Sequence, residues 1–286
     1  MSSSASDKTA SAPSISIRNL RVAFSQTTVL DGLDLAVPAG EIVALVGASG
    51  CGKSTLLRSI AKLIDADGGD IELESPTPLR RSGDLAFVFQ DATLLPWRTA
   101  FENVSLPFEL NKNERVSQTS QEQARSQRLP ADNQKFRGNT ARAKHIQSAL
   151  TAVGLSQDAW HRYPRQLSGG MKMRVSIARS IVTDPSVMLL DEPFAALDEF
   201  LRNRMNDLLL QLHSQRKRTI LFVTHNIAEA VYMGHRIAVL GRGKVDQVLE
   251  NPLPWPREPD ARSSVEFAAT YSQVSRALAQ LETQED

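Results

Sequence analysis

The chain of 286 residues contains one cysteine, almost no net charge and no long hydrophobic run. With Cys51 alone, no disulfide can form within the chain, which is typical of proteins in a reducing compartment. The 33 basic residues nearly balance the 32 acidic ones, and this argues against nucleic-acid binding through bulk charge. A membrane-spanning helix needs about 18 or more apolar residues in succession, and no segment comes near that length. Any role at a membrane would therefore be performed from its water side.

The amino-terminal segment, residues 1–13, also lacks the marks of a targeting sequence. It is rich in Ser and Ala and has no apolar stretch of about 7–15 residues, which a secretory signal requires. Lys8 is its only basic residue, whereas mitochondrial presequences are rich in Arg. We expect a disordered tail.

Patterns of apolar residues indicate an α/β fold. Residues 15–22 alternate apolar and polar side chains, as half-buried strands do. Residues 42–46 are continuously apolar, which is typical of a strand buried on both faces, and residues 54–64 then have helical spacing. Further strands are expected at residues 85–89, 187–190 and 219–223, and a further helix at 200–212. Strand, glycine-rich loop and helix in succession predict a mixed β-sheet with helices on both faces.

Two segments differ from this core. Residues 111–140 are dense in Gln, Ser, Arg and Asn, so they bury too little apolar surface to offset the entropy of ordering. We expect a flexible surface insertion there. Residues 251–286 form a C-terminal extension that we expect to end in a helix. The apolar residues with rough helical spacing in it are Phe267, Tyr271, Val274, Leu278 and Leu281.

The sequence GASGCGKST at residues 47–55 fits the phosphate-loop pattern G-x-x-x-x-G-K-[ST]. Glycines let backbone N–H groups point inward at phosphates, and the following helix offers the positive end of its dipole. Lys53 would reach the β- and γ-phosphates of ATP, and Ser54 would place its hydroxyl on Mg²⁺. Cys51 would contribute its backbone N–H rather than its thiol. The expected phosphate-binding residues are Gly47, Ser49, Gly50, Cys51, Gly52, Lys53, Ser54 and Thr55.

A second apolar strand, residues 187–190, leads into two acids, Asp191 and Glu192. An aspartate at the end of a strand beside a phosphate loop can hold Mg²⁺ through water. Glu192 can polarise the attacking water as a general base. An acidic pair after a strand is by itself often only the start of a helix, but its combination with the loop favours ATP hydrolysis.

The segment LSGGM at residues 167–171 resembles the signature of ATP-binding-cassette (ABC) ATPases. Gln90 after the strand at 85–89, Asp198 after Glu192 and His225 at the end of the strand at 219–224 occur in the order of that family, and the resemblance covers roughly residues 15–248. It implies an ATPase domain at 14–250 with a P-loop NTPase core, an N-terminal antiparallel β subdomain and a helical subdomain at about 91–170. A non-transport ABC ATPase, acting in DNA repair or translation, is the alternative. The short separation of Lys53 from the signature, without sustained heptads, and the single cassette argue against it.

The resemblance also implies that two copies sandwich each ATP between them. Leu167, Ser168, Gly169, Gly170 and Met171 of one copy would face the nucleotide that the other copy holds. Ser168 and Gly169 would then lie at a helix N-terminus, which is a ready anion site.

Catalytic roles follow from the same resemblance. Glu192 is expected to be the base, His225 the residue that contacts the γ-phosphate, and Gln90 the residue that touches Mg²⁺ and senses the membrane partner. Asp198 is expected to contact the second copy. Phe24 stands where an aromatic ring stacks on adenine, although a core phenylalanine is the alternative. The Mg²⁺ ligands would be Ser54, Gln90 and Asp191.

The sequence LLPW at residues 94–97, shortly after Gln90, resembles the corresponding segment of ATPases from importers of nitrate, sulfonate, taurine and related solutes. This implies transmembrane permease partners, an extracytoplasmic solute-binding protein and a place on the cytoplasmic face of the membrane. Trp97 would be an exposed interface anchor, or else a buried tryptophan of the helical subdomain. Two departures from the family pattern are Asn226, where Asp is common, and Met173, where Gln is common.

Overall fold

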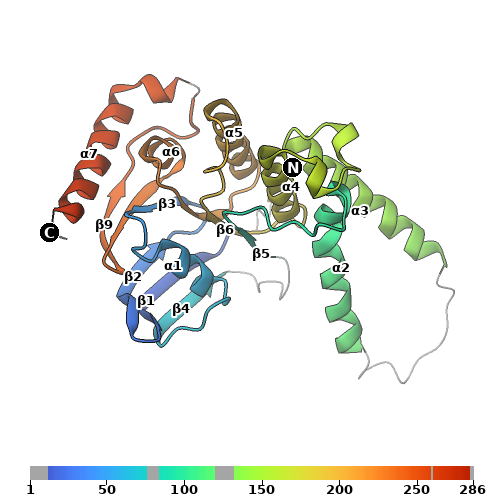
Figure 1. Cartoon of the computed structure of the whole chain (residues 1–286), viewed down its shortest axis with the longest axis horizontal. Coiled ribbons are helices and arrows are strands. Elements are labelled where there is room, and N and C mark those ends of the chain that lie inside the picture. Colours follow the sequence, from blue (N-terminus) through green and yellow to red (C-terminus); the bar gives the residue numbers. More distant parts are fainter. Residues whose placement is uncertain (1–11, 76–83, 120–131, 259, 284–286) are drawn as a thin grey trace, which may run out of the picture. The chain divides into compact units, whose positions relative to one another are not determined.

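The computed structural model describes residues 12–75, 84–119, 132–258 and 260–283 (Figure 1). The chain divides into two compact units, which are described separately below. Unit 1 combines residues 1–80 with 213–286, and unit 2 comprises residues 81–212.

Unit 1 begins with an antiparallel sheet. Strands β1 (Ser14–Phe24), β2 (Thr27–Val37) and β4 (Gly68–Glu74) pair in the order β2-β1-β4. Along β1 the side chains of Ile15, Ile17, Leu20 and Val22 are buried, because alternate residues of a strand point to the same face and an irregularity between Ile17 and Leu20 shifts the alternation by one residue. This confirms the predicted N-terminal β subdomain.

A mixed sheet forms the other half of unit 1. Strand β3 (Ile42–Gly47) runs parallel to both β7 (Thr219–Val223) and β8 (Arg236–Gly241), and β8 pairs antiparallel with β9 (Lys244–Glu250). All of β7 and all of β3 except its last residue are buried, which explains their continuous apolar sequences. The mixed α/β architecture expected from the sequence is confirmed.

Among the described residues of unit 1, three α-helices lie entirely within it: α1 (Lys53–Ile60), α6 (Ile227–Met233) and α7 (Val265–Glu282). Helix α1 ends before the predicted residue 64, because Lys62 adopts a positive φ of 55° that no α-helix continues. Helix α7 is the predicted terminal helix. It packs on α6 and β8 and lies close enough to Gly241 for a Cβ there to meet Leu281 at 2.7 Å.

Unit 2 pairs two parallel strands and carries most of the helices. Strand β5 (Leu85–Val88) lies beside β6 (Val187–Asp191). Helices α2 (Ala100–Thr119), α3 (Asp132–Ala152) and α4 (Gly169–Ile181) pack on one another, and α5 (Glu199–Gln215) begins in this unit and ends in unit 1. Within the described residues, no helix is both long enough and apolar enough to cross a membrane.

The segment expected as a flexible insertion, residues 111–140, is partly helical. Helix α2 continues to Thr119 and α3 begins at Asp132, so the prediction of a loop is wrong for those parts. Polar residues such as Glu, Arg, Gln and Lys have high intrinsic helix propensity and can extend a helix without burying surface. Residues 120–131 lie outside the described part of the chain.

Two histidines of unit 1 lie beside Trp255, His213 fully buried and His235 partly buried. His213 Nε2 lies 2.7 Å from the carbonyl oxygen of Gly40, and His235 Nδ1 accepts a hydrogen bond from the amide of Ile42 at 3.0 Å. The ring centroids of His235 and Trp255 are 3.9 Å apart. Burial lowers the pKa of His213 to about 4 and the pKa of His235 to about 3.

This arrangement predicts acid sensitivity. The unfolded histidines have a pKa near 6.5, so between about pH 6.5 and 4 the unfolded chain binds more protons than the folded one. The free energy of unfolding should therefore fall as the pH falls, by about 1.4 kcal/mol per pH unit for each histidine. Urea unfolding at several pH values should show a shallower dependence for His213→Gln. The exposed His161→Gln serves as the control, and equal slopes for both variants would contradict the prediction.

Candidate active site

The phosphate-loop sequence connects β3 to α1 in unit 1. Gly47 ends β3, and a Cβ there would lie 2.2 Å from the carbonyl oxygen of Leu240, so no larger residue fits. Gly52 precedes the first helical residue with a φ of 106°, a conformation that favours glycine. The backbone thus requires glycine at both ends of the motif.

Lys53 begins α1 and turns back over the loop. Its Nζ donates hydrogen bonds to the carbonyl oxygens of Gly47 at 2.9 Å and Ala48 at 2.7 Å, and the side chain is buried. The thiol of Cys51 lies 3.8 Å from the same nitrogen. Burial raises the pKa of that thiol against the opposing effect of Lys53, so Cys51 remains protonated at neutral pH. This agrees with a backbone rather than a thiol role.

His225 lies at the same edge of the sheet as the phosphate loop. Its strand, β7, pairs in parallel with β3 from Ile42 to Leu45, and the amide of Thr224 donates to the carbonyl of Leu45 at 3.2 Å. His225 is exposed, which excludes a core histidine. Asn226 caps α6 by accepting from the amide of Glu229. An amide and a carboxylate cap a helix almost equally well, so Asn226 in place of Asp is structurally neutral.

In unit 2, the parallel pairing of β5 with β6 places their carboxyl ends at one edge. Gln90 follows β5 and is exposed, whereas Asp191 is the last residue of β6 and is 1% exposed. Glu192 comes next with a φ of 44°, which is strained for a residue other than glycine. Strain of this kind is concentrated at functional sites.

The signature sequence forms the beginning of α4. Ser168 is the N-cap, and its hydroxyl accepts a hydrogen bond from the amide of Met171 at 3.3 Å. A Cβ at Gly169 would meet nothing within 4 Å, while one at Gly170 would lie 3.0 Å from Leu201. The helix N-terminus is therefore open on the side of Gly169, as an anion-binding terminus must be.

Two of the exposed aromatic residues were singled out by the sequence analysis. Phe24 at the end of β1 is 48% exposed, so it is not a core residue. Trp97 is 70% exposed, so the alternative of a buried tryptophan is wrong. Asp198 is also exposed, and its Oδ1 accepts from the amide of Leu201 at the start of α5.

The family model for the ABC transporter matches residues 30–195. The chain belongs to the ABC transporter family. It is the ATP-binding and ATP-hydrolysing subunit of such a transporter. Within the described residues, no cluster of three or more His, Cys, Asp or Glu side chains could hold a metal ion.

Several proteins resemble this ABC ATPase along most of its length. The aliphatic sulfonates import ATP-binding protein SsuB 2 of Agrobacterium fabrum is 38% identical over 96% of this chain and 93% of its own. The protein of the same name in Mesorhizobium japonicum is 40% identical over 93% of this chain and 92% of its own length. The aliphatic sulfonates import ATP-binding protein SsuB of Bacillus cereus is 35% identical over 88% of this chain and 92% of its own length.

Two structures of the cassette MJ0796 are similar to this chain at 28% sequence identity. A dimeric structure has a TM-score of 0.67, and a structure of a post-hydrolysis state bound to ADP and Pi has a TM-score of 0.66. Each covers 82% of this chain and 98% of its own. The P-loop NTPase fold of an ABC cassette is thereby established.

Two residues fix the segment after Gln90 by hydrogen bonds, and the sequence analysis did not predict these contacts. Arg179 of α4 donates from Nη1 to the carbonyl of Thr93 and from Nη2 to the carbonyl of Ala92 and to Thr93 Oγ1, at 3.0–3.1 Å. The buried Asn103 of α2 accepts from the amide of Leu95 and donates to three carbonyls of the same segment. The contact of Arg179 is tertiary, so spacing along the chain gave no signal for it, whereas Asn103 bonds only nearby residues of the preceding segment.

Arg179→Gln should loosen this segment while leaving the fold intact. Hydrogen bonds from a charged donor contribute about 1.5–3 kcal/mol each, and most of the three are lost. Amide hydrogen exchange over residues 91–97 should accelerate at least tenfold, and ATP turnover should fall. The exposed Arg165→Gln is the matched control. Unchanged exchange in Arg179→Gln would show that the segment is held by other contacts.

Proposed function

We propose that this ABC ATPase powers the import of aliphatic sulfonates or closely related small organic anions. The observation that carries the proposal is the similarity, 35–40% identity over most of the chain, to proteins named as aliphatic sulfonates import ATP-binding proteins. The LLPW sequence at residues 94–97 supports the same class. No observation favours a non-transport ATPase.

The phosphates of ATP would lie on the loop at residues 47–55, beside the amino end of α1. Lys53 would exchange its bonds to loop carbonyls for bonds to the β- and γ-phosphates. A Mg²⁺ ion that accompanies ATP would be held by Ser54, Gln90 and Asp191. Their hydroxyl, amide and carboxylate oxygens are the hard donors that Mg²⁺ prefers, and the ion would neutralise charge on the phosphates.

Hydrolysis would require a base, and Glu192 is the residue proposed for it. The strained backbone at Glu192 sets its carboxylate directly after the buried end of β6. His225 would contact the γ-phosphate from the end of β7, and Gln90 would touch Mg²⁺ and the attacking water. Phe24, exposed at the end of β1, would stack on the adenine.

A second copy of the chain would complete each ATP site. The open N-terminus of α4, with Leu167, Ser168, Gly169, Gly170 and Met171, would face the γ-phosphate held by the partner copy. Asp198 would contact that copy. The similarity to a dimeric cassette supports this arrangement. ATP would then act as the link between the two copies, and its hydrolysis would release them.

The membrane partners would be transmembrane permease subunits, served by an extracytoplasmic solute-binding protein. The exposed indole of Trp97, on a segment fixed by Arg179 and Asn103, suits an interface anchor. The chain would work as a peripheral protein on the cytoplasmic face of the membrane. No nucleic acid is expected as a partner.

Replacing Glu192 by Gln removes the proposed base while preserving the size of the side chain. We expect ATP binding to persist, an ATP-bound dimer to accumulate, and the turnover number to fall about 10²–10⁴-fold. Gel filtration with MgATP and a phosphate-release assay measure both effects. Lys53→Ala is the companion variant and should lose ATP binding itself. Near-normal turnover in Glu192→Gln would remove Glu192 from the mechanism.

The transported solute is tested with the complex rather than with this chain alone. The chain would be purified with the permease that it co-isolates with and reconstituted in liposomes. Uptake of a labelled alkanesulfonate should require MgATP and should be lost in Glu192→Gln. Uptake of labelled nitrate but not of the sulfonate would overturn the solute class, while absence of any ATP hydrolysis would overturn the enzymatic assignment.

A further inference from the structure

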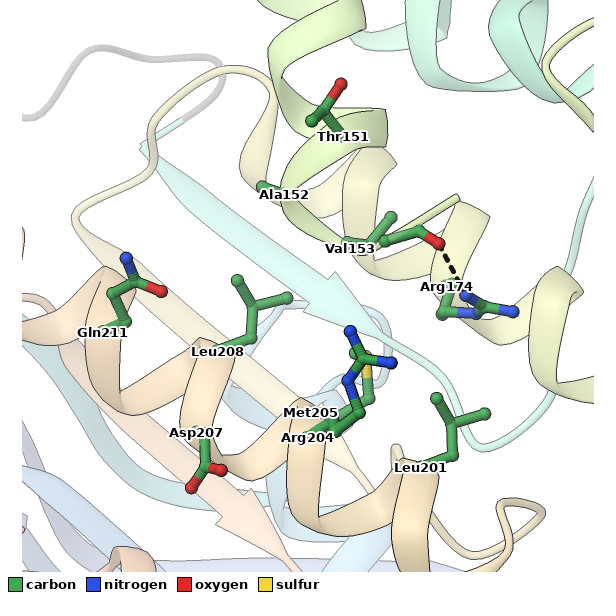
Figure 2. A pocket seen from close by; sticks show the side chains of 11 residues that line it. Thr151, Ala152, Val153, Arg174, Leu201, Arg204, Met205, Asp207, Leu208 and Gln211 are labelled. Carbon is green, nitrogen blue, oxygen red and sulfur yellow. Dashed lines mark hydrogen bonds between the residues drawn. The ribbon is translucent and has the colours of Figure 1, made fainter. Parts of the chain in front are cut away.

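Unit 2 contains a cavity of about 280 Å³ that the ATPase mechanism does not use. It lies between the end of α3, α4 and α5, and Figure 2 shows the side chains around it. We call it the two-arginine pocket, because Arg174 of α4 and Arg204 of α5 both line it. Its size is near the lower end for small-molecule sites.

The positive charges of the two guanidinium groups are paired with few hydrogen-bond acceptors in the part of the chain that the structure describes. Arg174 donates from Nη1 to the carbonyl of Gly154 at 2.8 Å, but its Nε is buried and has no hydrogen-bond partner among the described residues. Arg204 lies over the ring of Phe200 at 5.8 Å. Burial, and then the charge of Arg204, lower the pKa of Arg174. Two cations that repel each other are stabilised by an anion bound between them.

A carboxylate also lines the pocket, on α5. Figure 2 shows the side chain of Asp207 directed away from Arg204, whose guanidinium extends toward Arg174. The guanidinium groups of Arg174 and Arg204 thus face the pocket, whereas the carboxylate of Asp207 points away from it. Guanidinium groups bind oxyanions through pairs of parallel hydrogen bonds, so the polar end of a ligand would be an oxyanion.

The apolar part of the pocket lining indicates the chemistry of the end of the ligand opposite the oxyanion. Leu201, Met205 and Leu208 of α5 form an apolar wall. We propose that the two-arginine pocket binds a small organic oxyanion, a carboxylate or sulfonate with a short aliphatic chain. The head group lies between Arg174 and Arg204, and the aliphatic chain lies on the leucine and methionine side chains. Binding joins α4, which begins with the signature sequence, to α5.

The test follows the methyl NMR signal of Met205 in the full-length chain. The signal is assigned by its loss in Met205→Leu, and excess MgADP occupies the phosphate loop, which is itself an anion site. Titration with 1-butanesulfonate or butyrate should shift the signal with a dissociation constant on the order of 0.1–1 mM. Butylammonium, of similar size and opposite charge, should leave it in place.

Three arginine variants make the test specific. Arg204→Gln, at an exposed position, and Arg174→Gln should each weaken binding at least tenfold. Arg142→Gln is the matched control, because Arg142 likewise lies over a phenylalanine ring, at 5.9 Å, but does not line the pocket. Equal affinity of Arg204→Gln and Arg142→Gln would overturn the proposal. So would a Met205 signal that does not move with either anion, or one that moves equally with butylammonium.

Discussion

Every candidate catalytic side chain follows the carboxyl end of a parallel strand, and the hydrogen bonds that pair those strands fix where it lies. In unit 1, pairing of β3 with β7 sets the phosphate loop and His225 at one edge. In unit 2, pairing of β5 with β6 does the same for Gln90, Asp191 and Glu192. A register shift of one residue would turn each side chain to the opposite face. Complete burial of β6 and β7 opposes such a shift, because their apolar side chains pack on both faces.

The loops beyond these strands are held by a small set of polar side chains, each of which satisfies backbone groups that the strands and helices leave unpaired. Lys53 bonds two carbonyls of the phosphate loop, and Asn226 and Ser168 cap α6 and α4. Arg179 and Asn103 do the corresponding work for residues 92–99. The segment with the exposed Trp97 is therefore fixed to α4, the helix that starts with the signature sequence. Arg179 lies in the last turn of α4 and Ser168 caps its first turn, so the helix itself links that segment to the signature sequence.

How far the sequence predicted this depends on whether the signal was local. Strands β3, β5, β6 and β7 are short apolar runs, and the phosphate loop is a contiguous motif, so one window along the chain contained the whole signal. Arg179 and Thr93 are far apart in sequence, and nothing in either neighbourhood indicated their contact. Helices α2 and α3 were missed over residues 111–119 and 132–140 because a polar helix lacks the apolar periodicity on which the prediction depended. The two-arginine pocket likewise unites residues from three helices.

Two residues beside the edge of β5 and β6 have a positive φ that their side chains disfavour: Glu192 at 44° and Thr93 at 42°. Each such conformation costs about 1–3 kcal/mol and persists only where surrounding contacts determine it. A β-branched residue is an outlier there, and Thr93 is bonded through both its carbonyl and its hydroxyl to Arg179. Glu192 is preceded by a strand with no exposed residue. The stability that β6 and Arg179 provide thus offsets strain at Glu192, the proposed base, and at Thr93, which begins the segment that carries Trp97.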